Sequence, residues 1–153
     1  MRTFLALSMI VALCAGFVAV VSAQSGGDEA AVRASAKRIL DTFNAHDAKA
    51  NAALDDETYE NWDGSVKGPA EDEKSGREFF ERQKDVQRTM LEEIGIVQVT
   101  SDVAIYKFRG EWTGGIDEDG NARPRAEFLH AMVLVKRDGE WRLAAGFNRI
   151  TPE

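Results

Sequence analysis

Asp63 is the first side chain whose neighbours in the sequence suggest chemistry. It directly follows Trp62 and lies close to Tyr59. A carboxyl group among aromatic rings loses hydration, so its pKa rises and it can act as a general base near neutral pH. Because Gly64 follows it, Asp63 also fits a tight turn. The sequence leaves both interpretations open, a catalytic base and a turn residue.

His130 is the second candidate and interrupts an apolar run. A lone histidine on an apolar strand face either forms hydrogen bonds inside the core or meets a ligand and moves a proton. With Asp63 it would form an acid/base pair if the fold brings the two together. The sequence does not decide this.

We expect no metal and no cofactor. The chain has two histidines, His46 and His130, and one cysteine, Cys14. His46 stands at the end of a helical pattern, where solvent and the helix dipole explain it. The acidic segment 117–121 lacks the ligand spacing of a calcium loop, so we expect a turn there.

The N-terminus has the features of a secretory signal peptide. Arg2 precedes an apolar run from Phe4 to Val21, and small residues stand at the last and third-last positions before the cut, Ala23 and Val21. We expect cleavage after Ala23, hence a leader at 1–23, one domain at 24–153 and an exported protein, periplasmic or secreted. An uncleaved membrane anchor is the alternative. Leu13 before Cys14 argues against lipidation.

The expected mature chain is acidic and lacks cysteine. Its 130 residues carry a formal charge of −8, since cleavage removes Arg2 from a whole chain at −7. This charge disfavours nucleic acid and anionic membranes as partners. Without disulfides, stability must come from an ordinary core, which this length can provide.

The candidate residues need a scaffold, and its clearest part is the segment 128–148. Two apolar runs flank Asp138-Gly139, a sequence typical of a tight β-hairpin turn. A regular hairpin would place Phe147 opposite His130. Both faces of this hairpin are too apolar for water, so we expect helices on one face and a second copy of the chain on the other.

The rest of the chain predicts three helices and further strands. Apolar residues recur at helical spacing from Asp28 to about Asn44, Asp47 caps a short helix, and Ser75 opens a helix whose apolar stripe reaches Leu91. We expect an acidic loop at 69–74. Short strands are expected at 57–62 and 66–68 and long strands at 94–100 and 103–113, the last with its aromatic face inward. This order predicts an α+β domain.

Seven aromatic residues could line an apolar cavity or fill the core. They are Tyr59, Trp62, Phe79, Tyr106, Phe108, Trp112 and Phe147.

Three segments together resemble the SnoaL-like, or nuclear transport factor 2-like, superfamily. They are 43–47 (Phe-Asn-Ala-His-Asp), 76–80 (Gly-Arg-Glu-Phe-Phe) and 138–145 with Asn148. The resemblance implies a curved antiparallel sheet wrapped round three helices, a cone with an apolar pocket, and often dimerisation through the outer sheet face. It does not imply one activity, because relatives include isomerases, cyclases and binding modules.

The isomerase and cyclase patterns of the family match this chain in part. Asp63 falls near the isomerase base, but Ile39 and His130 or Ala131 occupy the places of the oxyanion hole. We therefore expect an exported domain that binds a small apolar molecule. The alternatives are an enzyme with Asp63 or His130 as acid/base, and a dimerising association module.

Overall fold

The computed structural model describes residues 28–60, 65 and 67–150. The expected leader and two of the candidate residues, Trp62 and Asp63, lie outside the described residues. The chain divides into two units, 1–31 and 32–153. Of the first unit, residues 28–31 are described, and they are helical. Everything that follows concerns the second unit.

The second unit begins in a helix that ends at residue 44. It is followed by α2 (Ala48–Ala52), β1 (Asp55–Glu60), α3 (Pro69–Arg82), β2 (Gln87–Thr100), β3 (Val103–Thr113), β4 (Ala126–Arg137) and β5 (Glu140–Ile150). No helix among the described residues is long and apolar enough to cross a membrane.

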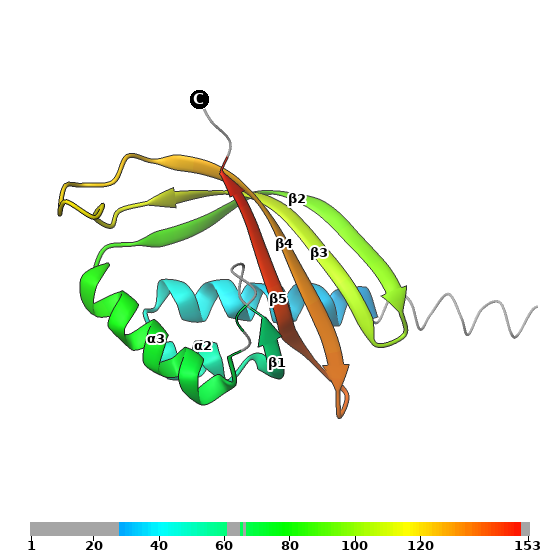
Figure 1. Ribbon diagram of the computed structural model, residues 1–153. Helices are drawn as coiled ribbons and strands as arrows, with labels where there is room; N and C mark the ends of the chain where they lie inside the picture. The colour runs from blue at the N-terminus through cyan, green and yellow to red at the C-terminus, as the bar shows by residue number, and fades with distance from the viewer. Residues whose placement is uncertain (1–27, 61–64, 66, 151–153) are drawn as a thin grey trace, which may run out of the picture. The chain divides into compact units, whose positions relative to one another are not determined.

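The five strands form one curved sheet in the order β1-β5-β4-β3-β2. Strands β2 to β5 are an antiparallel meander, and β1 joins β5 in parallel, so the sheet is mixed. Figure 1 shows the helices of this unit beneath the concave side of the sheet, with its convex side uncovered. The predicted α+β architecture is therefore confirmed, with one parallel pair added.

The core lies between the helix at 32–44 and the inner face of the sheet. The helix buries Val32, Ala36 and Ile39. The alternating side chains of β3 meet them, and Tyr106 and Phe108 are almost fully buried. The predicted inward aromatic face of β3 is confirmed.

Helix α3 differs from its prediction at both ends. It begins at Pro69, whose fixed φ suits a first helical position, and Glu71 and Asp72 in the first turn complement the helix dipole. The expected acidic loop is thus helical. The helix ends at Arg82, because the Gln83 side chain bonds both backbone groups of Ile116, at 2.7 and 3.1 Å.

Strand β2 replaces the second half of the predicted third helix. It runs from Gln87 to Thr100, although we expected helix up to Leu91. Met90 and Leu91 are each 40% exposed, so they form no inward helical stripe. The short strand expected at 66–68 is absent at its described residues, Lys67 and Gly68.

A β-bulge in β5 changes which residues face each other across the hairpin. Leu134 pairs with Leu143 as predicted, but Val133 pairs with Ala145, which leaves Ala144 as an extra residue. His130 consequently pairs with Asn148, and Phe147 lies opposite Ala131. The predicted pairing of Phe147 with His130 is wrong by one residue.

Candidate functional site

His130 lies on the inner face of β4, in a wall of aromatic rings. Its side chain is 7% exposed. The ring centroid lies 5.1 Å from that of Phe108 and 6.2 Å from that of Phe128. Its Nδ1 is hydrogen-bonded to Oδ1 of Asn148, the partner that the bulge brings opposite it.

This hydrogen bond determines which nitrogen of His130 is available. A side-chain carbonyl oxygen accepts, so Nδ1 carries the proton and Nε2 carries the lone pair. Burial lowers the pKa of His130 to about 4; the Asn148 bond opposes this shift and the Arg88 charge adds to it. The imidazole is therefore neutral at pH 7. Its Nε2 has no hydrogen-bond partner among the described residues.

Arg88 lies on the same inner face, at the start of β2. The side chain of Asn44, at the end of the first helix, bonds both backbone groups of Arg88 at 2.8 Å. Next to it, His46 Nε2 lies 2.8 Å from the Val86 carbonyl oxygen and accordingly donates to it. The helix end thus fixes the beginning of the strand and the position of Arg88.

The Arg88 guanidinium lies over two aromatic rings. Its central carbon is 3.8 Å from the ring centroid of Phe43 and 4.2 Å from that of Trp112. Burial lowers its pKa to about 10, and Tyr59 opposes this shift. Its Nε is sealed from solvent and has no hydrogen-bond partner. At pH 7 the Arg88 guanidinium is charged, and its Nε–H donor has no hydrogen-bond acceptor.

Asp55 in β1 is the buried carboxyl group of the site, at 3% exposure. Its Oδ2 meets no donor. Burial raises its pKa to about 9, and the charge and hydrogen bond of Asp72 in α3 add to the shift. Two carboxyl groups can share a hydrogen bond only if one of them holds a proton. We call Asp55 and Asp72 the carboxyl pair.

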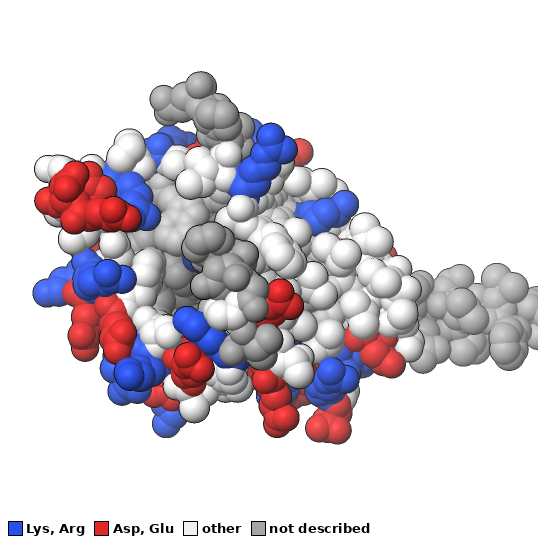
Figure 2. All heavy atoms as spheres, viewed as in Figure 1, with Lys and Arg blue, Asp and Glu red and all other residues white. Residues whose placement is uncertain are grey.

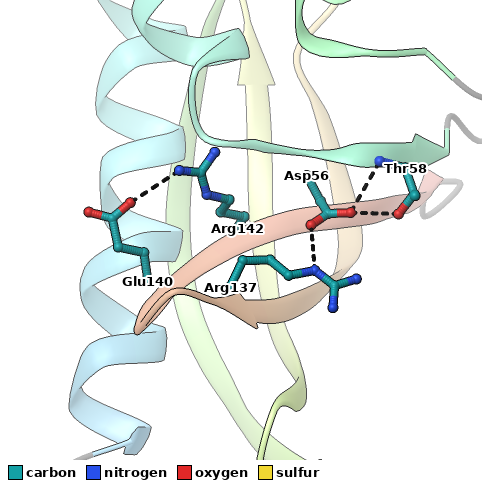
Figure 3. A network of polar contacts seen from close by, with 5 residues as sticks. All are labelled: Asp56, Thr58, Arg137, Glu140 and Arg142. Carbon is teal, nitrogen blue, oxygen red and sulfur yellow. Dashed lines mark hydrogen bonds and ion pairs between the residues drawn. The ribbon is translucent and has the colours of Figure 1, made fainter.

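The neighbouring residue Asp56 faces the other side of β1 and is fully satisfied. Figure 3 shows its carboxylate accepting from the Thr58 backbone and hydroxyl groups and from Arg137 Nε at 3.0 Å. Burial alone would raise the pKa of Asp56, but the bonds from Thr58 and Arg137 outweigh it and hold the pKa below its usual value. Of these two neighbouring aspartates, the one with an unsatisfied carboxyl oxygen, Asp55, is therefore the one on the inner face.

Tyr59 connects the carboxyl pair to Arg88. Burial, Asp55 and Asp72 raise the pKa of Tyr59 to about 12, while Arg88 acts in the opposite direction. The phenol is thus neutral at pH 7. Because Arg88 also acts on His130, these groups form one electrostatically connected set. We call it the interior polar group: Asp55, Tyr59, Asp72, Arg88 and His130.

The predicted aromatic residues are distributed over three environments. Tyr106 and Phe108 are core residues. Tyr59, Phe79 and Trp112 are half-buried and pack against the core clusters. Phe147 is 49% exposed, since the bulge turns it to the outer face. Trp112 contacts Arg88, and Phe108 contacts His130.

Two surface features bear on where a ligand could enter. An open depression of about 640 Å³ involves α2 and α3 and is lined by His46, Arg77 and Phe80 among others, but by none of the interior polar group. Figure 2 shows a hollow between the strands and α3, and charged side chains of both signs around it. Among the described residues no group of three metal-ligating side chains occurs.

Four residues of this arrangement were not predicted. Arg88 was hidden in the expected helix, Asp72 in the expected acidic loop, and Asn148 by the regular hairpin register. Asp55 lies two residues before the start of the strand expected at 57–62. A signal was the polar pair Asp55-Asp56 beside apolar Leu54, because successive side chains of a strand point to opposite faces and one of the two therefore points inward.

No family model and no curated protein matches this sequence. Solved structures do. They include a hexachlorocyclohexane dehydrochlorinase LinA-type3 from Novosphingobium barchaimii (TM-score 0.73, 15% identity, 86% of this chain and 91% of that one). A putative scytalone dehydratase from Novosphingobium aromaticivorans has TM-score 0.70 and 16% identity, with 86% and 89% covered. A nuclear transport factor 2-like protein from Salmonella enterica has TM-score 0.68 and 13% identity, with 84% and 94% covered.

Proposed function

We propose that this chain, which has the fold of the nuclear transport factor 2-like proteins, is a ligand-binding protein. The ligand is a small, largely apolar molecule that lies against the inner face of the sheet and donates a hydrogen bond to His130 Nε2. The observation that carries the proposal is the fixed, neutral imidazole with an unpartnered acceptor among aromatic rings. An exported protein remains our proposal for its location.

The half-buried aromatic side chains Tyr59, Phe79 and Trp112 supply the binding energy in this proposal. Burying apolar ligand surface is worth roughly 25 cal/mol per Å² before the costs of association are subtracted. A hydrogen bond to His130 then orients the ligand. Ligand sites generally combine an apolar lining with a few polar groups in this way.

An acid/base enzyme is the second candidate, and the names of the similar structures favour it: one is a dehydrochlorinase and another a putative dehydratase. Here His130 Nε2 would take a proton from carbon and Arg88 would stabilise the negative charge. The lowered pKa of His130, about 4, argues against this role. Each pKa unit by which a general base lies below the optimum near neutral pH lowers its affinity for the proton by about 1.4 kcal/mol. We therefore favour binding.

A second copy of the chain is our proposed partner for the convex sheet face. This outer apolar face consists of Val97, Ile105, Leu129, Val133 and Phe147. Val97, Leu129 and Phe147 are each more than 40% exposed. Such a contiguous apolar surface is typical of an interface.

A thermal-shift screen tests the binding proposal. The purified protein is melted with a panel of small lipophilic compounds, and hits are repeated with His130→Ala and His46→Ala. We expect the ligand-induced rise in Tm to fall markedly in His130→Ala and to persist in His46→Ala, the matched histidine control. Equal effects of the two substitutions, or no hit in the panel, would contradict the proposal.

A further inference from the structure

The Arg88 guanidinium has aromatic contacts but no anion. Among residues 28–60, 65 and 67–150, no ion pair involves Arg88 and no hydrogen bond involves its side chain; the other arginines that form ion pairs lie at the surface, such as Arg109 with Glu92 and Glu127. Tyr59, which is close enough to influence it, carries no charge at pH 7. The interior therefore holds an uncompensated positive charge.

Such a charge is costly unless something compensates it. Moving a cation away from water costs several kcal/mol, and removing a partner from a buried ion pair typically costs about 3–5 kcal/mol. The rings of Phe43 and Trp112 recover part of this through cation–π contacts, roughly 0.5–2 kcal/mol each. Rings accept no conventional hydrogen bond from the in-plane N–H groups, so the buried Nε–H remains unsatisfied.

Arg88 as a whole is partly exposed, so its side chain is not fully closed off from a ligand. Its Nε is buried without a hydrogen-bond partner. Its position is fixed through Asn44 at the backbone and through two rings at the side chain. A planar guanidinium of fixed orientation binds a carboxylate through two parallel hydrogen bonds.

We infer that the small molecule bound by this domain is an organic carboxylate, whose carboxylate group pairs with Arg88 while its apolar body lies against Trp112. The inference rests on the proposed function and names its ligand class. Trp112 is half-buried, and its ring centroid lies 4.2 Å from the central carbon of the Arg88 guanidinium, so it offers an apolar surface beside the cation. A hydroxyl group on the same ligand supplies the hydrogen bond to His130 Nε2.

The test compares an acid with its uncharged amide. The probes are 3-(4-hydroxyphenyl)propionate and 3-(4-hydroxyphenyl)propionamide, which share the ring, the hydroxyl group and the length. Calorimetric titration of the unmodified protein near neutral pH should show the acid binding at least about tenfold more tightly than the amide. Arg88→Gln should remove this difference, while Arg109→Gln, a control on the exposed outer face, should preserve it.

The outcomes separate this inference from the proposed function. Equal affinity for acid and amide in the unmodified protein overturns the carboxylate inference and leaves binding of apolar molecules intact. A preference for the acid that survives in Arg88→Gln also overturns it, because the charge is then recognised elsewhere. If neither probe binds, the carboxylate inference is wrong, and the lipophilic screen alone decides the proposed function. Should Arg88→Gln fail to fold, Arg88→Lys keeps the charge but loses the two-bond geometry and should reduce the preference.

Discussion

The carboxyl pair makes a quantitative prediction about stability and pH. Asp55→Asn replaces the protonated partner of Asp72 by an amide of similar shape that can still donate a hydrogen bond. In the folded protein the pKa of Asp55 is raised to about 9, whereas in the unfolded chain it returns to its ordinary value of 3.8. Between these values the folded state holds one more proton than the unfolded state.

The sign and size of the effect follow from this extra proton. Raising the pH favours the state that binds fewer protons, so Asp55 lowers the free energy of unfolding as pH rises, by up to about 1.4 kcal/mol per pH unit. Asn cannot titrate and removes this contribution. When the pH rises from about 5 to about 7, the free energy of unfolding of Asp55→Asn should increase by up to about 2.7 kcal/mol relative to that of the unmodified protein.

Urea unfolding followed by tryptophan fluorescence at several pH values measures the effect, because the slope with urea shows whether both proteins unfold with the same change in exposed surface. Glu57→Gln is the control, since it removes a carboxylate from an exposed position of the same strand. Its stability relative to the unmodified protein should change with pH by less than about 0.5 kcal/mol. If Asp55→Asn shows an equally small change, the buried shared proton is refuted.

Two further predictions concern His130 and the outer apolar face. Arg88→Gln should raise the pKa of His130 because it removes a repelling charge, and Asn148→Ala should lower it because it removes the bond that favours protonation; NMR titration of the imidazole measures both. Shifts in the same direction would contradict the arrangement around His130. Val133→Glu, which buries a charge in the proposed interface, should convert a dimer into a monomer in sedimentation experiments. An unmodified protein that already sediments as a monomer would exclude this interface.

The elements with uninterrupted local patterns were predictable from the sequence. Strand β3 alternates without a break from Val103 to Gly110, and Asp138-Gly139 forms the turn of the hairpin. Both depend on interactions between residues close in the chain or on strict alternation. The helix capped by Asp47 is of the same kind, since the Asp47 side chain accepts from the Ala50 N–H.

The site depended on contacts between distant residues, and there the sequence was insufficient. The apolar spacing of residues 79–91 continues the helical period through Arg88. However, the Gln83 side chain forms hydrogen bonds with Ile116, 33 residues away, and the Asn44 side chain with Arg88, 44 residues away, so the segment joins the sheet. The register between β4 and β5 at Asn148 depends on a single bulge, and the sequence of the hairpin turn does not predict that bulge. The pairing of Asp55 with Asp72 requires α3 to begin six residues earlier than its capping pattern indicated.

The extra residue in β5 has a consequence for how the surroundings of His130 can change over generations. Since every position beyond Ala144 is out of phase with a regular strand, inserting one codon just after Ala144, with the bulge kept, would place Phe147 in place of Asn148 opposite His130. A polar contact would become an aromatic one without any substitution in the lining itself. Length variation in one strand is thus a route by which descendants of this chain could acquire a different chemistry around the same imidazole.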